Sequence, residues 1–147
     1  MVKIVLLEKK DLPVLAKLFK QFWNEETNIE KMQATFSKLI RNPAYHLLGA
    51  QKEGKLVGFA MGIVCEELYG ECEPFMMIED FIVDKKYRRN GIGAALMAAL
   101  EQRAIEQNCC QVLFVTEANR KEAIRFYSSM GYDPNSHTGF KKRVRPD

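Results

Sequence analysis

The stretch Arg88-Arg89-Asn90-Gly91-Ile92-Gly93-Ala94 lies between a long apolar run, Phe75 to Val83, and a helical pattern, Gly91 to Gln107. The change of pattern predicts a turn that leads from a strand into a helix. Gly91 and Gly93 let a ligand approach the backbone, where the first amides of a helix lack intrahelical acceptors and favour a negative charge. The basic side chains just before the helix are Lys85, Lys86, Arg88 and Arg89. The stretch therefore predicts a turn that binds phosphate.

Two well-known phosphate-binding patterns are excluded at this turn. No Gly-Lys-Ser or Gly-Lys-Thr follows it, so it is not a Walker P-loop. The spacing Gly-x-Gly-x-x-Gly of dinucleotide-binding folds is not present either. A glycine-rich turn that binds nothing is the alternative interpretation. Arg88, the basic run and the strand-to-helix context favour a phosphate-binding turn over that alternative.

Outward from this turn, apolar periodicity predicts a mixed α/β chain. In order, the expected elements are a strand at 2–7, a helix after Asp11, a helix with its N-cap at Thr27, strands at 46–51, 56–65 and 75–83, a helix at 91–107, a strand at 111–116, a helix with its N-cap at Asn119 and a strand at 139–144. One helix separates strands 75–83 and 111–116, so these two strands are expected to be parallel. No linker, repeat or low-complexity tract interrupts the chain, and residues 1–147 are predicted to form a single domain.

The composition is that of a soluble globular protein. Of 147 residues, 47% are hydrophobic and 28% are charged, which excludes disordered, collagen-like and disulfide-rich classes. No uncharged apolar run reaches the roughly 18 residues of a membrane span, and the N-terminal apolar stretch is too short for a signal peptide. A cytoplasmic protein without a membrane partner is therefore expected. No metal is expected either, because the cysteines and histidines lack metal-site spacing; they are Cys65, Cys72, Cys109, Cys110, His46 and His137.

Charged residues are unevenly distributed along the chain. Leu56 to Asp84 contains seven acids and no lysine or arginine, and the basic residues of 85–89 follow at once. An acidic stretch directly before a basic one creates electrostatic potentials of opposite sign side by side, which predicts an anion-binding subsite next to a cation-binding subsite. The alternative is that both stretches are solvent-exposed faces without a ligand. A second basic run, 141–145, is interpreted as a solvated tail, because no nucleic-acid-binding motif accompanies it. No nucleic-acid partner is expected.

In four segments the sequence resembles the GNAT superfamily of N-acetyltransferases. Arg88, Gly91 and Gly93 occupy the fixed positions of its signature, Gln/Arg-x-x-Gly-x-Gly/Ala. A later Asn, a helix with Ala and Phe-Tyr, and a closing Gly-Tyr are also similar to the family: Asn119, Ala123, Phe126, Tyr127, Gly131 and Tyr132. The segment 54–60 looks like the family's hairpin, and the segment 78–83 resembles diamine acetyltransferases. The resemblance covers essentially the whole chain.

The resemblance implies a GNAT fold, which is a single mixed sheet with a splayed central pair of parallel strands flanked by helices. It also implies acetyl-CoA as the cosubstrate, bound between those strands. The backbones of Phe81, Ile82 and Val83 would then bind the pantetheine arm. The pyrophosphate would be held by Arg88, Arg89, Asn90, Gly91, Ile92, Gly93 and Ala94, and the thiol end would be lined by Asn119, Phe126 and Tyr127.

The resemblance implies direct transfer of the acetyl group to an amine and matches Tyr127 with the family's general acid. The amine must lose a proton before it attacks, and Glu79 is the candidate base, because a carboxylate in an apolar strand has a raised pKa. Asp80 is the competing candidate, since neighbouring strand residues point to opposite faces and one of the two must face inward or toward a cleft. A core tyrosine and a solvent-facing acid are the alternative interpretations.

No motif fixes the acceptor site. Its walls are expected in the segments 23–28 and 66–73, and Asp80 is expected to contribute to binding the amine. The carboxylates of these two segments would suit a cationic amine, with solvated loops as the alternative; they are Glu25, Glu26, Glu66, Glu67, Glu71 and Glu73. The predicted function is an acetyl-CoA-dependent N-acetyltransferase acting on a primary amine of a small cationic molecule. A protein or peptide N-acetyltransferase and a non-catalytic acyl-CoA-binding regulatory module are the alternatives. The oligomeric state, a homodimer included, is left open.

Overall fold

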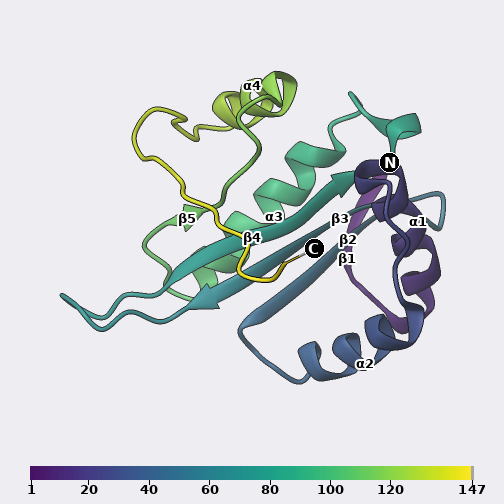
Figure 1. Cartoon of the computed structure of the whole chain (residues 1–147), viewed down its shortest axis with the longest axis horizontal. Coiled ribbons are helices and arrows are strands. Elements are labelled where there is room, and N and C mark those ends of the chain that lie inside the picture. Colours follow the sequence, from purple (N-terminus) through teal and green to yellow (C-terminus); the bar gives the residue numbers. More distant parts are fainter. Residues whose placement is uncertain (147) are drawn as a thin grey trace. The chain divides into compact units, whose positions relative to one another are not determined.

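The computed structural model, drawn in Figure 1, describes residues 1–146. These residues form two compact units, with the boundary between Leu113 and Phe114. The first unit contains β1 (Val2–Leu6), η1 (Lys9–Asp11), α1 (Leu12–Trp23), α2 (Ile29–Leu39), β2 (Tyr45–Lys52), β3 (Lys55–Cys65), β4 (Phe75–Val83), η2 (Lys85–Tyr87), α3 (Ile92–Glu106) and β5 (Val112–Leu113). The second contains α4 (Lys121–Ser129). The elements of the first unit up to α3 closely match those that the periodicity predicts.

The first unit is built on one mixed sheet of five strands in the order β1-β2-β3-β4-β5. The strands β1 to β4 are antiparallel to one another in succession. After the crossover through α3, β5 pairs with β4 in parallel. The pairing of β5 is short: it joins Met76 with Val112 and Met77 with Leu113. The pairing ends at Met77 and Leu113. The α/β class and the parallel pair are as the sequence predicts.

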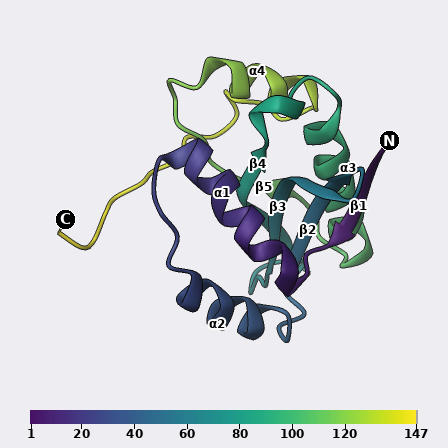
Figure 2. The same ribbon diagram turned by 90° about the vertical axis from the view of Figure 1, so that its right-hand side faces the viewer.

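Helices cover both faces of this sheet, with α1 and α2 on one face and α3 on the other (Figure 2). The face under α1 is the apolar core, where Leu12 and Leu15 are buried with Phe59 and Ile82. On the opposite face α3 lies close to β3. A Cβ atom on Gly58 would lie 3.2 Å from side-chain atoms of both Ile92 and Leu96.

A bulge in β4 changes the face that its residues occupy. Met61 pairs with Glu79 and Phe59 pairs with Ile82, so Asp80 and Phe81 together stand opposite the single residue between the two partners on β3. Asp80 has a φ of 55°, a left-handed conformation that non-glycine residues seldom adopt. Without the bulge, Ile82 would share the α3 face with Met76 and Ile78; instead it belongs to the core under α1.

The predicted N-caps of two helices are wrong. The Asn28 side chain caps α2 by accepting a hydrogen bond from the Lys31 amide at 3.0 Å, so Thr27 lies outside the helix. The N-cap position of α4 is occupied by Arg120 and has no side-chain hydrogen bond. Asn119 precedes it in a turn, where its carbonyl oxygen accepts a hydrogen bond from the Lys121 amide at 3.0 Å.

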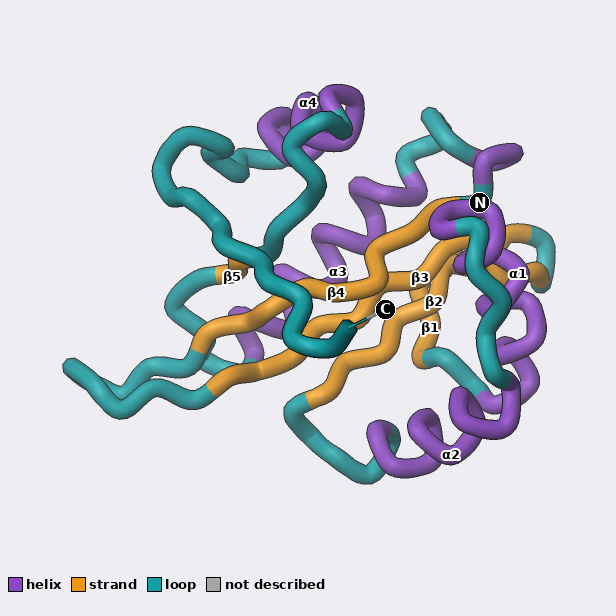
Figure 3. The backbone as a smooth tube through the Cα atoms, viewed as in Figure 1, coloured by secondary structure: helices purple, strands orange, loops and turns teal. Residues whose placement is uncertain are grey.

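The last two predicted strands are also corrected. Instead of 111–116, only Val112–Leu113 is a strand, and Phe114 packs its ring against Tyr132 in the second unit at 4.9 Å between centroids. The segment 139–144 contains no strand; Figure 3 draws it as loop. Phe140 is 92% exposed, so this charged segment has no apolar face that a sheet could bury.

Candidate active site

The turn at the start of α3 has the backbone of an anion-binding site. Gly91 occupies the N-cap position with a φ of 76°, and no side chain caps the helix. A Cβ atom on Gly91 would have no heavy atom within 4 Å, so the space above this position is open. No acidic residue lies in the first turn of α3. The first amides of a 15-residue helix are therefore exposed to an anion without a competing carboxylate.

Hydrogen bonds in the segment before Gly91 fix the shape of this turn. The Asp84 carboxylate caps η2 by accepting from the Lys86 amide at 3.0 Å. The Asn90 side-chain amide donates to the Tyr87 carbonyl oxygen at 3.1 Å. Arg88 donates from Nε to the Val83 carbonyl oxygen at 3.4 Å and stays exposed. An open glycine, free helical amides and exposed basic side chains fit a pyrophosphate.

The strand that leads into this turn is paired on one side only. Ile82 pairs with Phe59 and Val83 with Gly58 on β3. On the other edge, β5 pairs with β4 at Met76 and Met77 and reaches no further. The parallel pair of β4 and β5 that the family resemblance implies is present, and its pairing is limited to two residues of each strand.

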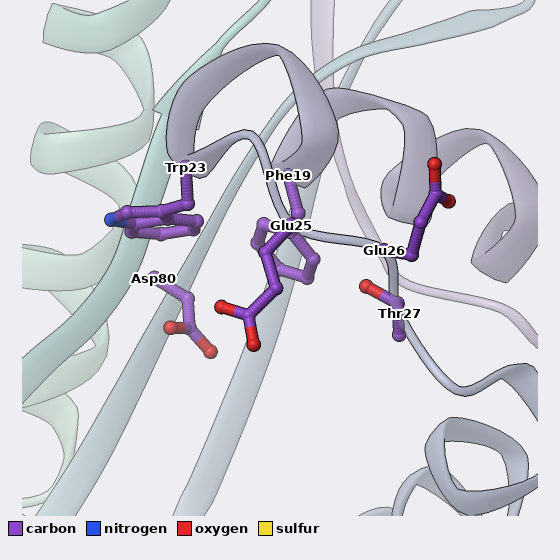
Figure 4. A pocket seen from close by; sticks show the side chains of 6 residues that line it. All are labelled: Phe19, Trp23, Glu25, Glu26, Thr27 and Asp80. Atoms are coloured by element: carbon purple, nitrogen blue, oxygen red, sulfur yellow. The ribbon is translucent and has the colours of Figure 1, made fainter. Parts of the chain in front are cut away.

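A pocket of about 320 Å³, here called the acid pocket, lies where α1 ends and the chain passes toward α2. It is lined by Phe19, Trp23, Glu25, Glu26, Thr27 and Asp80. Asn24 ends α1 in a left-handed conformation with a φ of 54°, which turns the following residues over the sheet. In Figure 4 the carboxylates of Glu25 and Asp80 point into the pocket beside the Trp23 ring, whereas the Glu26 carboxylate points away.

The charges of the acid pocket are not compensated equally. Glu26 forms a 3.2 Å ion pair with Lys20. Within residues 1–146, neither Glu25 nor Asp80 forms an ion pair. Burial, and then the charge of Glu79, raises the pKa of the Asp80 carboxyl group. A pocket with negative charge and an aromatic wall can bind an ammonium group, and a carboxylate with a raised pKa can accept a proton from it.

The structure places the two candidate bases on the same face of the sheet. Glu79 pairs with Met61, and cross-strand partners share a face. Asp80 follows at the bulge and lines the acid pocket on that same face. Glu79 is exposed and is not part of the pocket lining, whereas Asp80 is half-buried. The expected alternation between the two residues is therefore wrong at this point of β4.

The acid pocket includes one residue that the sequence did not single out and omits a segment that it did. Phe19 has the spacing of a core residue on α1 and so does not signal a binding site, whereas the segment 23–28, expected as a wall, does contribute to the lining. The segment 66–73, expected as a wall, contributes nothing to the lining. It lies in the exposed connection between β3 and β4, where Leu68 is 97% exposed.

The remaining predicted site residues lie in the second unit. Tyr127 is half-buried on α4, with its ring 4.6 Å from that of Phe114 and 5.3 Å from that of Phe126. Burial raises the pKa of the Tyr127 hydroxyl, and the charge of Arg120 opposes this shift. The hydroxyl is therefore protonated at neutral pH and can donate. Asn119 is exposed in the turn before α4.

Two further features concern metal binding and membrane insertion. Among the residues that the structure describes, no group of three or more His, Cys, Asp or Glu side chains is arranged to hold a metal ion. No helix within residues 1–146 has both the length and the apolar character needed to cross a membrane.

Comparisons with known proteins agree with this geometry. Residues 12–132 match the model of the acetyltransferase (GNAT) family. A spermine/spermidine N(1)-acetyltransferase of Bacillus subtilis is 31% identical over 119 residues, which cover 80% of this chain and 78% of the relative. The human spermidine/spermine N(1)-acetyltransferase-like protein 1 is 30% identical over 146 residues; the match covers 90% of this chain but 21% of that much longer protein.

A solved structure extends the likeness to the fold. An aminoglycoside acetyltransferase from an uncultured soil metagenomic sample, in complex with sisomicin, has a TM-score of 0.80 and 26% sequence identity. The match covers 98% of this chain and 97% of that one. The family match spans most of the chain and includes both the turn at Gly91 and the helix that carries Tyr127. This chain belongs to the acetyltransferase (GNAT) family.

Proposed function

We propose that this protein transfers an acetyl group from acetyl-CoA directly to a primary amine of a small cationic molecule. One observation carries the proposal: Glu25 and Asp80, neither of them ion-paired within residues 1–146, meet in one pocket beside Trp23. The strand that carries Asp80 runs on into the turn at Gly91. A cation subsite and an anion subsite on one strand suit a cationic acceptor and a polyanionic donor.

The donor is held mainly through the backbone in this proposal. Bound acetyl-CoA supplies a thioester whose acetyl carbon is open to attack by an amine. Peptide groups of Phe81, Ile82 and Val83 hold the pantetheine arm at the edge of β4. The segment 88–94 holds the pyrophosphate, with amides of the first turn of α3 donating to phosphate oxygens. Asn119 and Phe126 line the thiol end.

A carboxylate removes the proton that the ammonium group carries at neutral pH. Glu79 and Asp80 are the two candidates for this base. Burial in the acid pocket and a raised pKa support Asp80, because a base works best when its pKa is near the working pH. Glu79 lies beside it on the same face and is the alternative, with or without a bridging water.

Tyr127 acts as the general acid. Its hydroxyl donates a proton to the thiolate sulfur as the bond from sulfur to the acetyl carbon breaks and the bond from nitrogen to that carbon forms. The raised pKa of Tyr127 supports this role, because it keeps the hydroxyl protonated until the thiolate appears. Phe114 and Phe126 pack around the ring and fix its orientation.

A panel of amines assayed for free thiol release from acetyl-CoA tests the function. We expect cationic primary amines to be acetylated and carboxylate-bearing or neutral acceptors to be poor. Glu25→Gln should raise KM for a cationic amine about tenfold, the effect of losing one hydrogen bond to a charged group. Glu30→Gln removes the same charge from an exposed position outside the pocket and is the matched control. Equal turnover of anionic and cationic acceptors would contradict the proposal.

A further inference from the structure

A second cavity, here called the apolar groove, adjoins the acid pocket on the same face of the sheet. Its volume is about 370 Å³, and it lies between α1, α2 and the strands beneath them. Phe59 and Met61 of β3 form part of its floor. Phe19, Thr27 and Asp80 line both cavities, so the groove and the acid pocket lie side by side.

The groove exists because α2 does not close the core completely. Phe36 is buried, but Met32 and Leu39 on the same side of α2 are only half-buried, and all three line the groove. The helix is in contact with α1. A volume above about 300 Å³ with a mostly apolar lining is typical of a small-molecule site.

Charge is distributed unequally between the two cavities. The acid pocket is lined by Glu25, Glu26 and Asp80, whereas Asp80 is the one carboxylate among the described residues that line the groove. Among the other residues that line the groove, the one charged side chain is Lys31, which is exposed at the start of α2. A cation that entered the groove beyond Asp80 would find no counter-ion and would approach a like charge.

We infer that the acceptor is an amphiphilic primary amine: a single ammonium group in the acid pocket, joined to an uncharged aliphatic or aryl chain that lies in the apolar groove. This inference rests on the proposed acetyl transfer to amines. It excludes linear diamines and polyamines as the preferred substrates, because their second ammonium group would lose its water in the groove without gaining a carboxylate partner. The groove therefore determines specificity beyond the reacting nitrogen.

A chain that binds in the apolar groove should make kcat/KM depend on the length of the amine's alkyl chain. Each methylene group transferred from water into an apolar site strengthens binding by about fourfold. In a series from propylamine to hexylamine, kcat/KM should rise by about this factor per carbon until the groove is filled. Hexylamine should exceed 1,6-diaminohexane, which has the same chain, by at least tenfold.

A charge reversal at Lys31 tests the cause of this preference. Lys31→Glu places a carboxylate at the groove, and Glu at this position of the first helical turn is compatible with α2. The variant should raise the ratio of kcat/KM for 1,6-diaminohexane to kcat/KM for hexylamine at least fivefold. Lys38→Glu makes the same change of net charge on α2 outside the groove and is the matched control. The preference should be the same in this control as in the unchanged protein.

Binding measured apart from turnover separates the inference from the proposed function. Calorimetric titration of the protein and coenzyme A with hexylamine and with 1,6-diaminohexane should show tighter binding of hexylamine. If diamines are acetylated as well as or better than monoamines, or if chain length has no effect, the inference is overturned and the amine acetyltransferase stands. If hexylamine binds preferentially but no amine is acetylated, the groove's preference stands and the proposed function fails. If neither amine binds nor reacts, both fail.

Discussion

Glu79 of β4 pairs directly with Met61 of β3, but two residues further along β3 Phe59 pairs with Ile82 rather than Phe81, so the pairing has shifted by one residue. The two-to-one bulge that results leaves Asp80 on the face of the sheet that carries the acid pocket. Two acidic side chains thus occupy one face of β4 in succession, and the charge of Glu79 contributes to the raised pKa of Asp80. A neighbouring like charge disfavours the ionised form of Asp80.

The first prediction concerns the pH dependence of turnover. A base must be ionised to act, so the rate with a cationic amine should rise with pH through the raised pKa of Asp80. Asp80→Asn should lower turnover about 10²-fold at neutral pH and recover in part at high pH, where more amine is already deprotonated. The same pH–rate profile for Glu79→Gln identifies which carboxylate is the base. A profile of Asp80→Asn that superimposes on that of the unchanged protein would assign the role to Glu79 or to solvent.

The second prediction concerns stability. A rise in pH that ionises Asp80 should increase turnover but should lower the free energy of unfolding. The folded-state pKa of Asp80 is raised above its ordinary value of 3.8, so the folded protein holds this proton more tightly than the unfolded chain. The free energy of unfolding therefore falls as the pH rises from 3.8, the ordinary pKa, to the raised pKa of Asp80 in the folded protein. Asp80→Asn carries no charge and should be more stable than the unchanged protein at pH 7, but not below pH 3.8. Denaturant unfolding at both pH values checks this, and a loss of stability at pH 7 would contradict it.

The sequence predicts the sheet well because its signal is local. Apolar runs of strand length and a helix between β4 and β5 are sufficient to give the order of the elements in the first unit. The bulge at Asp80 is different, because it depends on how β4 pairs with β3, and nothing in the residues 75–83 alone specifies a partner. Consequently the alternation rule assigns Glu79 and Asp80 to opposite faces, where the structure places them together.

In the candidate site, too, features set by consecutive residues are predictable and features assembled from distant segments are not. The turn at Gly91 is predictable, since its glycines and basic residues are consecutive in the sequence. The acid pocket is assembled from the end of α1 and a bulge some sixty residues later, and Phe19 has the same spacing as its core neighbours. Thr27 and Asn28 are both residue types that cap helices. Asn28 is the N-cap of α2 in the structure, because Asn is the better N-cap residue.

The next prediction concerns Tyr127. Tyr127→Phe keeps the ring that packs against Phe114 and removes only the hydroxyl. If this hydroxyl protonates the leaving thiolate, turnover should fall roughly 10²-fold while the affinity for acetyl-CoA barely changes. Steady-state kinetics combined with calorimetry of acetyl-CoA binding separates the two effects. Unchanged turnover would mean that the thiolate takes its proton from another source.

A prediction for the coenzyme turn uses the open space at Gly91. A Cβ atom would meet nothing within 4 Å there, but the φ of 76° penalises a branched side chain in any case. Asn tolerates the left-handed conformation better than other residues, so Gly91→Asn adds bulk at little cost to the fold. Affinity for coenzyme A should fall at least tenfold with little change in the melting temperature. Calorimetry that gives equal affinity in a folded variant would show that the phosphates bind elsewhere.

The last prediction concerns His46, which is 8% exposed on β2 and whose Nε2 has no hydrogen-bond partner within residues 1–146. Burial, and then the charge of Arg103, lowers the pKa of His46, while Glu106 opposes this shift. The unfolded chain therefore takes up a proton near pH 6.5 that the folded protein resists. The free energy of unfolding should fall as pH drops below about 6.5, with a slope of up to about 1.4 kcal/mol per pH unit for one proton. His46→Leu removes this titration, so its unfolding free energy, measured in urea between pH 7.5 and 5, should decline less steeply. Identical slopes for the two proteins would show that other groups cause the loss of stability in acid.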